Sequence, residues 1–338
     1  MAVSYTEQVY NPHEHKWQLI ISSRNSGSNY DVSDAVDGSI TWTTERGGHA
    51  GKVQFTVVKN AGEMIYHEGD NVRLMCDGKP LFSVFVDTKS KHQASITTTC
   101  YDQMFSLKSK QSYNFADMTA TGIVSLIAGE FGLTLGDVTD TGYILPAKIY
   151  EEATLLDIIT DSVQQTIIAT GKVYNFYDDA GKLALKEPKD MASKYIIGNG
   201  SLATDYTYET SISDAYNYIK LVRPNKDTNQ GDVIVESDPE AEAAWGRIQY
   251  YAKVDEHLND AQIHEQAKQL LEYYCQTKRT LKVTALGVPD IQAGSMVMMD
   301  IPDLGDIKLT KMLLINKCVH HISASSWTMD LEMRVVNG

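Results

Sequence analysis

The chain has 338 residues, of which 44 are Asp or Glu and 30 are Lys or Arg, so its formal net charge is −14 at pH 7. This length predicts two or three domains, and a hydrophobic fraction of 43% suffices for buried cores. The acidic balance and the lack of a basic stripe exclude a general nucleic-acid-binding protein. No stretch approaches the ~18 apolar residues of a membrane span, and no secretion signal is visible, so we expect cytoplasmic synthesis and no membrane anchor.

Residues 1–112 predict a first β domain after a polar N-terminal arm. Its segments are short, rich in β-branched residues and partly alternating, as half-buried strands are. Asp77-Gly78 is a typical two-residue hairpin turn. The short links predict a compact antiparallel barrel or sandwich. The expected strands are 16–21, 39–45, 51–59, 71–76, 81–89 and 94–101.

Residues 113–202 predict a small α+β domain. Apolar residues recur with a helical period in 119–133, where Thr119 or Thr121 would cap the helix and Gly132 would end it. A second helix is expected over 154–170, between Thr154 as cap and Gly171 as stop. The segment 172–187 then predicts a hairpin.

Residues 203–338 predict a second β domain. The segment 231–246 has five acids and no base, which favours a solvated loop. One amphipathic helix is expected over 259–278, beginning at Asn259 or Asp260 and packing against the second barrel. Its apolar face contains Ile263, Ala267, Leu270, Leu271 and Tyr274.

Segments 69–100 and 294–333 form a weak internal repeat. Each begins with Gly, continues with a strand led by Val72 or Val297, and has a turn, a second strand and a Ser/Thr-rich last strand. Identity is low, and unrelated meanders share such patterns. If the repeat is a duplication, two antiparallel barrels of one topology, each with its own sheet, flank the α+β domain.

Histidine and cysteine patterns give little support for a metal site. His13 and His15 would share one face of a strand, but no third ligand is evident. His320 and His321 are adjacent, so we expect one inward and one outward ring. The four cysteines are far apart in the sequence and predict reduced thiols. They are Cys76, Cys100, Cys275 and Cys318.

Acidic residues do not form an obvious catalytic pair. Glu151-Glu152 precedes a helix, where negative charge suits the helix dipole, and Asp178-Asp179 falls in a hairpin turn. A glycosidase needs two converging carboxylates, and no hydrolase or nucleotide-binding motif occurs. Asp102 lies between a strand and a helical turn, so we interpret it as an N-cap at a structural junction. We expect no catalytic, cofactor-binding or metal-binding residues.

The segment 81–110 resembles the baseplate-hub proteins of contractile phage tails and phage-tail-like particles, of the prophage XkdQ type in the late-control-D-like superfamily. In that family a strand pair ends in Tyr-Asp before a short helical run, and the C-terminal part has a Gly-led strand and a closing strand. The order of these motifs covers nearly the whole chain, although none is specific alone. The matching residues are Tyr101, Asp102, Gln103, Leu107, Gly294, Trp327, Met329 and Leu331.

The resemblance implies a structural protein rather than an enzyme, made in the bacterial cytoplasm and assembled into a tail. Such hubs are homotrimers with two tube-type barrels per subunit. They contact the tail tube protein, the central spike protein and other baseplate proteins, and they match a six-fold tube to a three-fold spike. An acidic lumen would repel passing DNA. The alternatives are a tail-associated peptidoglycan hydrolase and a distal-tail or receptor-binding component.

Overall fold

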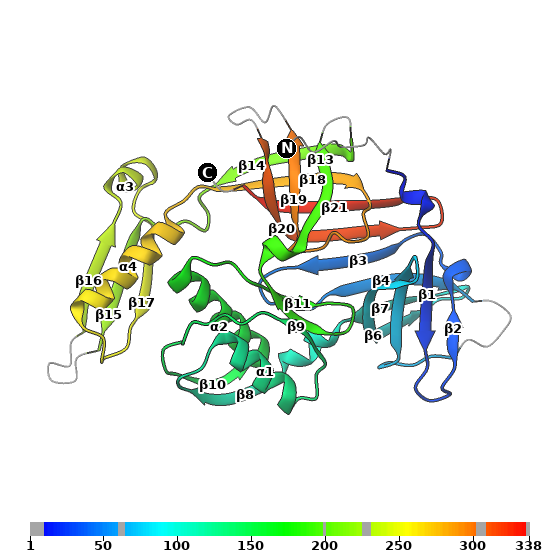
Figure 1. Cartoon of the computed structure of the whole chain (residues 1–338), viewed down its shortest axis with the longest axis horizontal. Helices are drawn as coiled ribbons and strands as arrows, with labels where there is room; N and C mark the ends of the chain where they lie inside the picture. Colours follow the sequence, from blue (N-terminus) through cyan, green and yellow to red (C-terminus); the bar gives the residue numbers. More distant parts are fainter. Residues whose placement is uncertain (1–9, 60–64, 199–200, 225–230, 302–308, 336–338) are drawn as a thin grey trace, which may run out of the picture.

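The structure is a computed structural model that describes residues 10–59, 65–198, 201–224, 231–301 and 309–335. Within these residues it forms one 13-stranded sheet, one two-stranded sheet and two three-stranded sheets (Figure 1). The predicted class, mainly β with an α+β insert, is confirmed. No helix in this part of the chain is long and apolar enough to cross a membrane. Most of the predicted N-terminal arm, residues 1–9, lies outside the described residues.

The first β region has the strand order β2-β1-β5-β6-β7-β4-β3. Side chains alternate as the sequence predicts; in β4, for example, Val53, Phe55 and Val57 point into one apolar core. Both turn residues between β5 and β6, Asp77 and Gly78, have positive φ (50° and 78°), as a tight hairpin turn requires. The strands are β1 (Trp17–Ser22), β2 (Asn29–Asp31), β3 (Ile40–Glu45), β4 (Lys52–Val58), β5 (Asn71–Cys76), β6 (Lys79–Lys91) and β7 (Ser95–Tyr101).

The second β region has the strand order β13-β19-β20-β21-β18-β14. Its core is a separate cluster that includes Met329 and Leu331 of the predicted closing strand. The strands are β13 (Ala192–Gly198), β14 (Ala203–Ser211), β18 (Lys278–Leu286), β19 (Met296–Ile301), β20 (Leu309–Ile322) and β21 (Trp327–Arg334).

The two β regions share strand order and register. Strands β1-β5-β6-β7-β4-β3 correspond one by one to β13-β19-β20-β21-β18-β14. Val72 pairs with Val84 in the first region, as Val297 pairs with Leu313 in the second. The β6·β7 pair has a register shift after Val86, and the equivalent β20·β21 pair has one after Ile315, at the equivalent position. The prediction of one repeated topology is confirmed, with one difference: β1 is antiparallel to β5, whereas β13 is parallel to β19.

The expectation of two separate sheets is wrong. Strand β3 of the first region pairs antiparallel with β20 of the second region, so the hydrogen bonding continues through both (Figure 1). The physical reason is that the edge strand of one unit offers unpaired backbone groups, which the neighbouring unit satisfies. By the criterion of the prediction, that each region has its own sheet, a shared sheet is enough to discard the duplication. The common strand order and register argue against that criterion, because two units of one topology are here joined edge to edge.

The middle of the chain folds around a third core, as two helices with two small sheets. Thr119 caps α1 and Thr154 caps α2, each by accepting a backbone N–H, and Gly171 ends α2 in the left-handed conformation. The elements are β8 (Lys110–Phe115), α1 (Ala120–Glu130), β9 (Leu135–Val138), β10 (Lys148–Thr154), α2 (Leu155–Thr170), β11 (Asn175–Asp178) and β12 (Leu183–Lys186).

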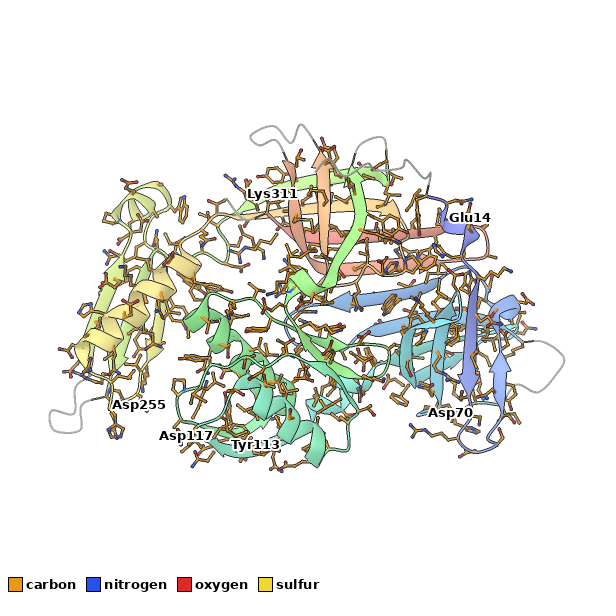
Figure 2. All side chains as sticks on the ribbon, in the orientation of Figure 1. Glu14, Asp70, Tyr113, Asp117, Asp255 and Lys311 are labelled. Atoms are coloured by element: carbon orange, nitrogen blue, oxygen red, sulfur yellow. The ribbon has the colours of Figure 1, made fainter. Side chains whose placement is uncertain are left out.

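The structure around a fourth apolar core differs from two predictions. The acidic segment is not a loop, because β16 pairs with β15 and α3 follows it; Val233-Ile234-Val235 supplies the alternation that its charges conceal. Helix α4 covers this three-stranded sheet rather than the second β region. The unit lies at the opposite end of the molecule from Glu14, with Asp255 at its tip (Figure 2). Its elements are β15 (Tyr218–Arg223), β16 (Asp232–Ser237), α3 (Pro239–Trp245), β17 (Gln249–Lys253) and α4 (Asp260–Tyr274).

Helix α4 begins at the predicted cap but ends four residues early. Asn259 forms a capping box with Gln262. The predicted apolar face is confirmed, since Ile263, Ala267 and Leu270 are buried and Leu271 and Tyr274 pack beside them. The domain boundaries 1–112, 113–202 and 203–338 stay a prediction, to which the structure adds that β13 joins the second β region.

Candidate functional site: the seam between the β regions

The seam consists of β3, Ile40–Glu45, and the C-terminal half of β20, Lys317–Ile322, which pair antiparallel. Lys317 lies opposite Glu45, and their charged groups form an ion pair of 3.2 Å. Ile322 of β20 and Trp327 of β21 are buried in the core of the first β region. The seam is therefore both a hydrogen-bonded strand pair and a shared apolar contact.

His320 lies at the centre of the seam and is fully buried. Its ring stacks on Trp42, with centroids 5.0 Å apart and planes 16° apart. With a proton on Nε2 the imidazole donates to the carbonyl of Ile291 (2.7 Å), and Nδ1 accepts the indole N–H of Trp327 (3.1 Å). Burial lowers the pKa of His320 to about 4. The ring is thus neutral and hydrogen-bonded through both nitrogens within the second region, and its stacking on Trp42 contacts the first.

The strand faces of the two histidines are as predicted. His320 points inward, whereas His321 is half-buried on the outer face, where Nε2 lies 3.1 Å from Asp330. Trp327 is held tightly on the inner side. Its carbonyl accepts the N–H of Gly287 at 2.9 Å, and a Cβ at Gly287 would lie 1.9 Å from the indole. Only glycine fits at this position.

A second group of contacts fixes the middle of the chain to the seam. Arg46, directly after β3, donates to the side chains of Asn175 (3.3 Å) and Asn316 (3.2 Å). Asn175 in turn donates to the carbonyl of Ala293 at 3.3 Å. Gly294 has φ +94°, and a Cβ there would lie 1.9 Å from the Asn175 amide. Gly294 is thus required both by backbone conformation and by a close contact.

Asp102 connects β7 to the middle core. It caps the 3-10 helix Gln103–Lys108 by accepting the N–H of Met104 at 2.9 Å, and its other oxygen accepts the N–H of Gly51 at 2.6 Å. The predicted cap is confirmed. Burial, with the charge of Asp178 second, raises the pKa of Asp102 well above its usual range. The contacts of this carboxyl group are those of a structural junction, because both of its oxygens accept backbone N–H groups.

The other residues of the predicted Tyr-Asp motif have packing contacts. Tyr101 stacks on Phe105, with centroids 4.8 Å apart, rather than on the end of the barrel. Leu107 is buried in the middle core. The predicted motif residues therefore lie in three different cores rather than in one site. Their common role as a structural motif stays a prediction.

The N-terminal arm contacts the β5–β6 turn. Nδ1 of His15 lies 2.6 Å from the Asp77 carboxylate, which also accepts the N–H of Lys16 at 2.9 Å. The ligand atoms of His15, Cys76 and Asp77 all lie within 4.8 Å of one another, a grouping that could hold a metal ion. The His13 side chain, part of the predicted pair, lies outside the described residues. The four cysteines are free, and Cys275 alone among them is not fully buried.

The two predicted carboxylate pairs have separate local roles. Glu151 and Glu152 lie in β10 at a register shift, and Glu152 has φ +48°. Asp178 accepts the N–H of Gly181 at 2.6 Å, as a turn residue does, and the Gln103 amide at 2.8 Å. The amide contact fixes the β11–β12 hairpin to the Asp102 junction.

Sequence reasoning missed the central residues of the seam. Trp42 and Arg46 were part of a correctly predicted strand and its end, but nothing in the local pattern indicated their partners. Alternation of apolar and polar residues shows which face of a strand is buried, but it does not determine which other strand pairs with it. The available signal was the inward position of His320, since a buried histidine requires polar partners.

Comparison with known proteins places the chain in a family. The sequence matches the YqbQ-like family over residues 40–334. Over 269 residues it is 31% identical to the uncharacterized protein YqbQ of Bacillus subtilis (strain 168), covering 79% of this chain and 81% of that protein. Over 287 residues it is 28% identical to the phage-like element PBSX protein XkdQ of the same organism, covering 83% and 87%.

A solved structure shares the fold. The 43 kDa tail protein of prophage MuSo2 from Shewanella oneidensis superposes with a TM-score of 0.67 at 13% identity, covering 94% of this chain and 98% of that protein. The chain is therefore similar in sequence to a protein of a phage-like element and in fold to a prophage tail protein. By the family match and the first of these relatives, it belongs to the YqbQ-like family.

Proposed function

We propose that the chain is the structural hub of a contractile-tail baseplate, in an infectious phage or a phage-tail-like particle. It forms a homotrimer at the end of the tail tube and matches the six-fold tube to the three-fold central spike. Its partners are a second and third copy of itself, the tail tube protein, the spike protein and other baseplate proteins. It is made in the bacterial cytoplasm, assembled into the tail, and acts without catalysis.

The observation that carries this proposal is the repeated unit and the way its two copies are joined. Each β region has the same six-strand order, and β3·β20 joins them side by side within one chain. Three chains then provide six similar β regions, which is the number that a six-fold tube can contact. Differences between the regions, such as the parallel β13·β19 pair, leave a three-fold pattern for the spike.

The net charge of −14 suits this position. A tube that conducts DNA repels phosphates if its wall is acidic, so the nucleic acid passes without being bound. The buried acids at the Asp102 junction support a structural role, because they accept backbone and amide hydrogen bonds. The similarity to the PBSX protein and to the prophage tail protein supports the assignment to a tail.

Light scattering of the purified chain, alone and mixed with the tube protein from the same genome, tests this proposal. The expected result is a monomer or a trimer alone and a trimer in the mixture. A stable dimer or hexamer in the mixture, or no change from a monomer, would reject the hub. The mass measured in the mixture is the informative value. The chain alone can be a monomer, because a hub that formed its ring early in the cytoplasm would hinder assembly.

A further inference from the structure

We propose that β14 of one chain pairs with residues 88–93 in a second copy of the chain, in the register of β3·β20. These residues are the last four of β6 and the two that follow it. The inference rests on the hub function above and names the contact that would join its subunits. Glu209 would lie opposite Ser90. The remaining pairs are Thr88 with Ser211, Lys89 with Thr210, Lys91 with Tyr208, His92 with Thr207 and Gln93 with Tyr206.

The register follows from the internal repeat. β3 corresponds to β14, because Thr41 pairs with Gln54 in β4 as Thr207 pairs with Lys282 in β18. The end of β6 corresponds to the end of β20, because the register shift after Val86 matches that after Ile315. Within the chain, β3 already pairs with the end of β20. The equivalent pair, β14 with the end of β6, is the one that a single chain leaves unmade.

The segment beside β6 leaves room for such a strand. Gly69 donates to the carbonyl of Val86 (2.7 Å), and Val86 donates to that of Asp70 (2.9 Å; Asp70 is labelled in Figure 2). The second region repeats both bonds: Gly294 to Ile315 (2.8 Å) and Ile315 to Ser295 (3.0 Å). In that region the pairing of β20 with β3 begins at Lys317, two residues after Ile315. The same backbone arrangement beside β6 is therefore compatible with an added strand.

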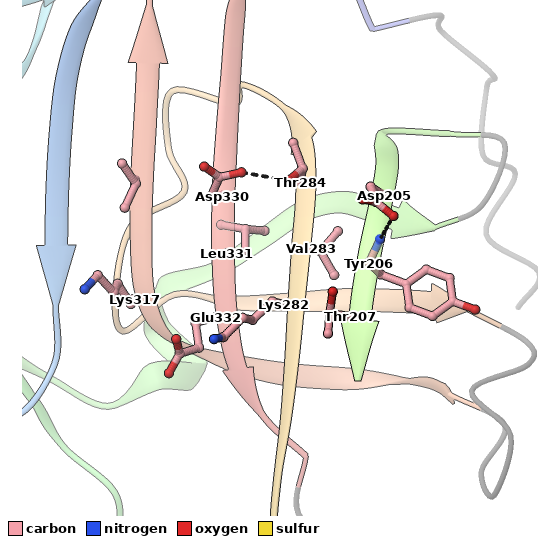
Figure 3. Close-up of a pocket in the computed structure, with 11 residues that line it drawn as sticks. Asp205, Tyr206, Thr207, Lys282, Val283, Thr284, Lys317, Asp330, Leu331 and Glu332 are labelled. Atoms are coloured by element: carbon pink, nitrogen blue, oxygen red, sulfur yellow. Dashed lines mark hydrogen bonds between the residues drawn. The ribbon is translucent and has the colours of Figure 1, made fainter. Parts of the chain in front are cut away.

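Exposure separates the joined edges from the open ones. Residues 317–322 of β20 are all buried or half-buried, whereas residues 88–93 are exposed except for Lys89. Ile40 of β3 is fully buried, but its counterpart Tyr206 in β14 is 37% exposed. Among the described strands β14 pairs with β18 alone, and Figure 3 shows it as the outermost strand of its row. A strand that pairs on one side only among the described strands is a ready site for another strand.

Charge favours this occupant. At the seam the acid is on β3 and the base on β20, as in the pair Glu45–Lys317. The two edges have the same overall polarity, because β14 carries the exposed acids Asp205 and Glu209 and the end of β6 carries the exposed Lys91. In this register Lys91 and Glu209 lie on opposite faces of the strand pair, so the attraction is between the edges as a whole, and Lys89 is already paired with Glu68 within the chain. Each chain thus has one half of the contact at β14 and the complementary half at β6. Such a head-to-tail contact joins one copy to the next, and three chains close into a ring if each strand pair relates neighbouring β regions by one sixth of a turn.

A disulfide trap tests the register. Ser90→Cys and Glu209→Cys are introduced together into the full chain, with Cys275→Ser because the other three cysteines are buried. Their counterparts at the seam, Val319 and Thr43, are directly opposite and half-buried, so neither substitution affects a core. Strand neighbours at this position have Cα atoms about 5 Å apart, which a disulfide can span. The matched control pairs Ser90→Cys with Asp205→Cys, an exposed acid about 13 Å further along β14.

Oxidation of the purified variant mixed with the tube protein from the same genome, where the trimer is expected, should convert most of the chain into disulfide-linked species that reduction removes. Linking should be several-fold greater than in the control, and the series should end at three chains. Equal linking in both variants, or none, overturns the strand pairing. Selective linking that continues beyond three chains keeps the pairing and rejects the trimeric hub. Trimers seen by light scattering without selective linking keep the hub and reject this contact.

Discussion

The imidazole of His320 lies parallel to the indole of Trp42, with ring centroids 5.0 Å apart. One residue belongs to β20 of the second β region and the other to β3 of the first. The buried stacking of this pair and the backbone pairing of β3 with β20 together join the two repeated units directly. Such a direct join is what the proposed hub would require of two β regions that stand in for neighbouring tube proteins.

The first prediction is a loss of stability at acidic pH that depends on His320. Burial lowers the pKa of this histidine to about 4, whereas an unfolded histidine has a pKa near 6.5. Its contribution is therefore complete above about pH 6.5 and is lost as the pH falls toward 4, by about 3 kcal/mol in all. Urea unfolding followed by tryptophan fluorescence at several pH values measures it.

Two variants isolate this effect. His320→Asn should flatten the dependence of the unfolding free energy on pH between about pH 6.5 and 4. His321→Asn is the matched control, because its ring is on the outer face, and it should keep the slope. An equal slope in both variants would show that His320 is not the titrating group.

The second prediction concerns Asp102→Asn. The amide keeps one acceptor oxygen, so either Met104 or Gly51 loses its partner, and the free energy of unfolding should fall by on the order of 1 kcal/mol while assembly is kept. Chemical denaturation and light scattering measure the two. Asp157→Asn, an exposed acid in the first turn of α2, is the control with a smaller effect. Loss of a chemical turnover at unchanged stability would instead make Asp102 catalytic.

The third prediction concerns Gly294→Ala. A methyl group at φ +94° and 1.9 Å from the Asn175 amide should destabilise the protein by about 2–4 kcal/mol. Gly27→Ala is the matched control: its φ is +66° with nothing within 4 Å of a Cβ, so only about 1 kcal/mol is expected. Adding Asn175→Ala should recover part of the Gly294→Ala loss in a double-mutant cycle. Strict additivity would show that the contact is not the cause.

The fourth prediction is that chain purified without an affinity tag holds less than one equivalent of zinc or nickel. The oxygens of Asp77 already accept hydrogen bonds from His15 and Lys16. Burial, with the charge of Asp77 second, raises the pKa of the Cys76 thiol to about 11, so the thiolate ligand is scarce at neutral pH. Elemental analysis measures the metal. One tight equivalent that His13→Ala or His15→Ala removes would contradict this prediction.

The sequence was informative wherever one local signal determined one element. Alternation located β4 and β5, and the caps Thr154 and Asn259 located two helix starts, because these features depend on neighbours in the chain. The fold of segment 231–246 was missed because acids on β16 and α3, most of them half-buried, concealed a strand of ordinary alternation.

Partners between distant elements could not be predicted in the same way. The apolar face of α4 was correct, yet its partner sheet was not, since a stripe of apolar residues specifies burial without specifying what covers it. The seam has the same origin: Trp42 and His320 are far apart in the sequence, and their contact exists only because β3 pairs with β20.

Cryo-electron microscopy of intact tails tests the central claim most directly, by the number and place of this chain. The account predicts three copies at the end of the tube, with six β regions around the axis and β3·β20 alternating with β14·β6. Six copies per tail end, or a position in the sheath or on peripheral fibres, would contradict it.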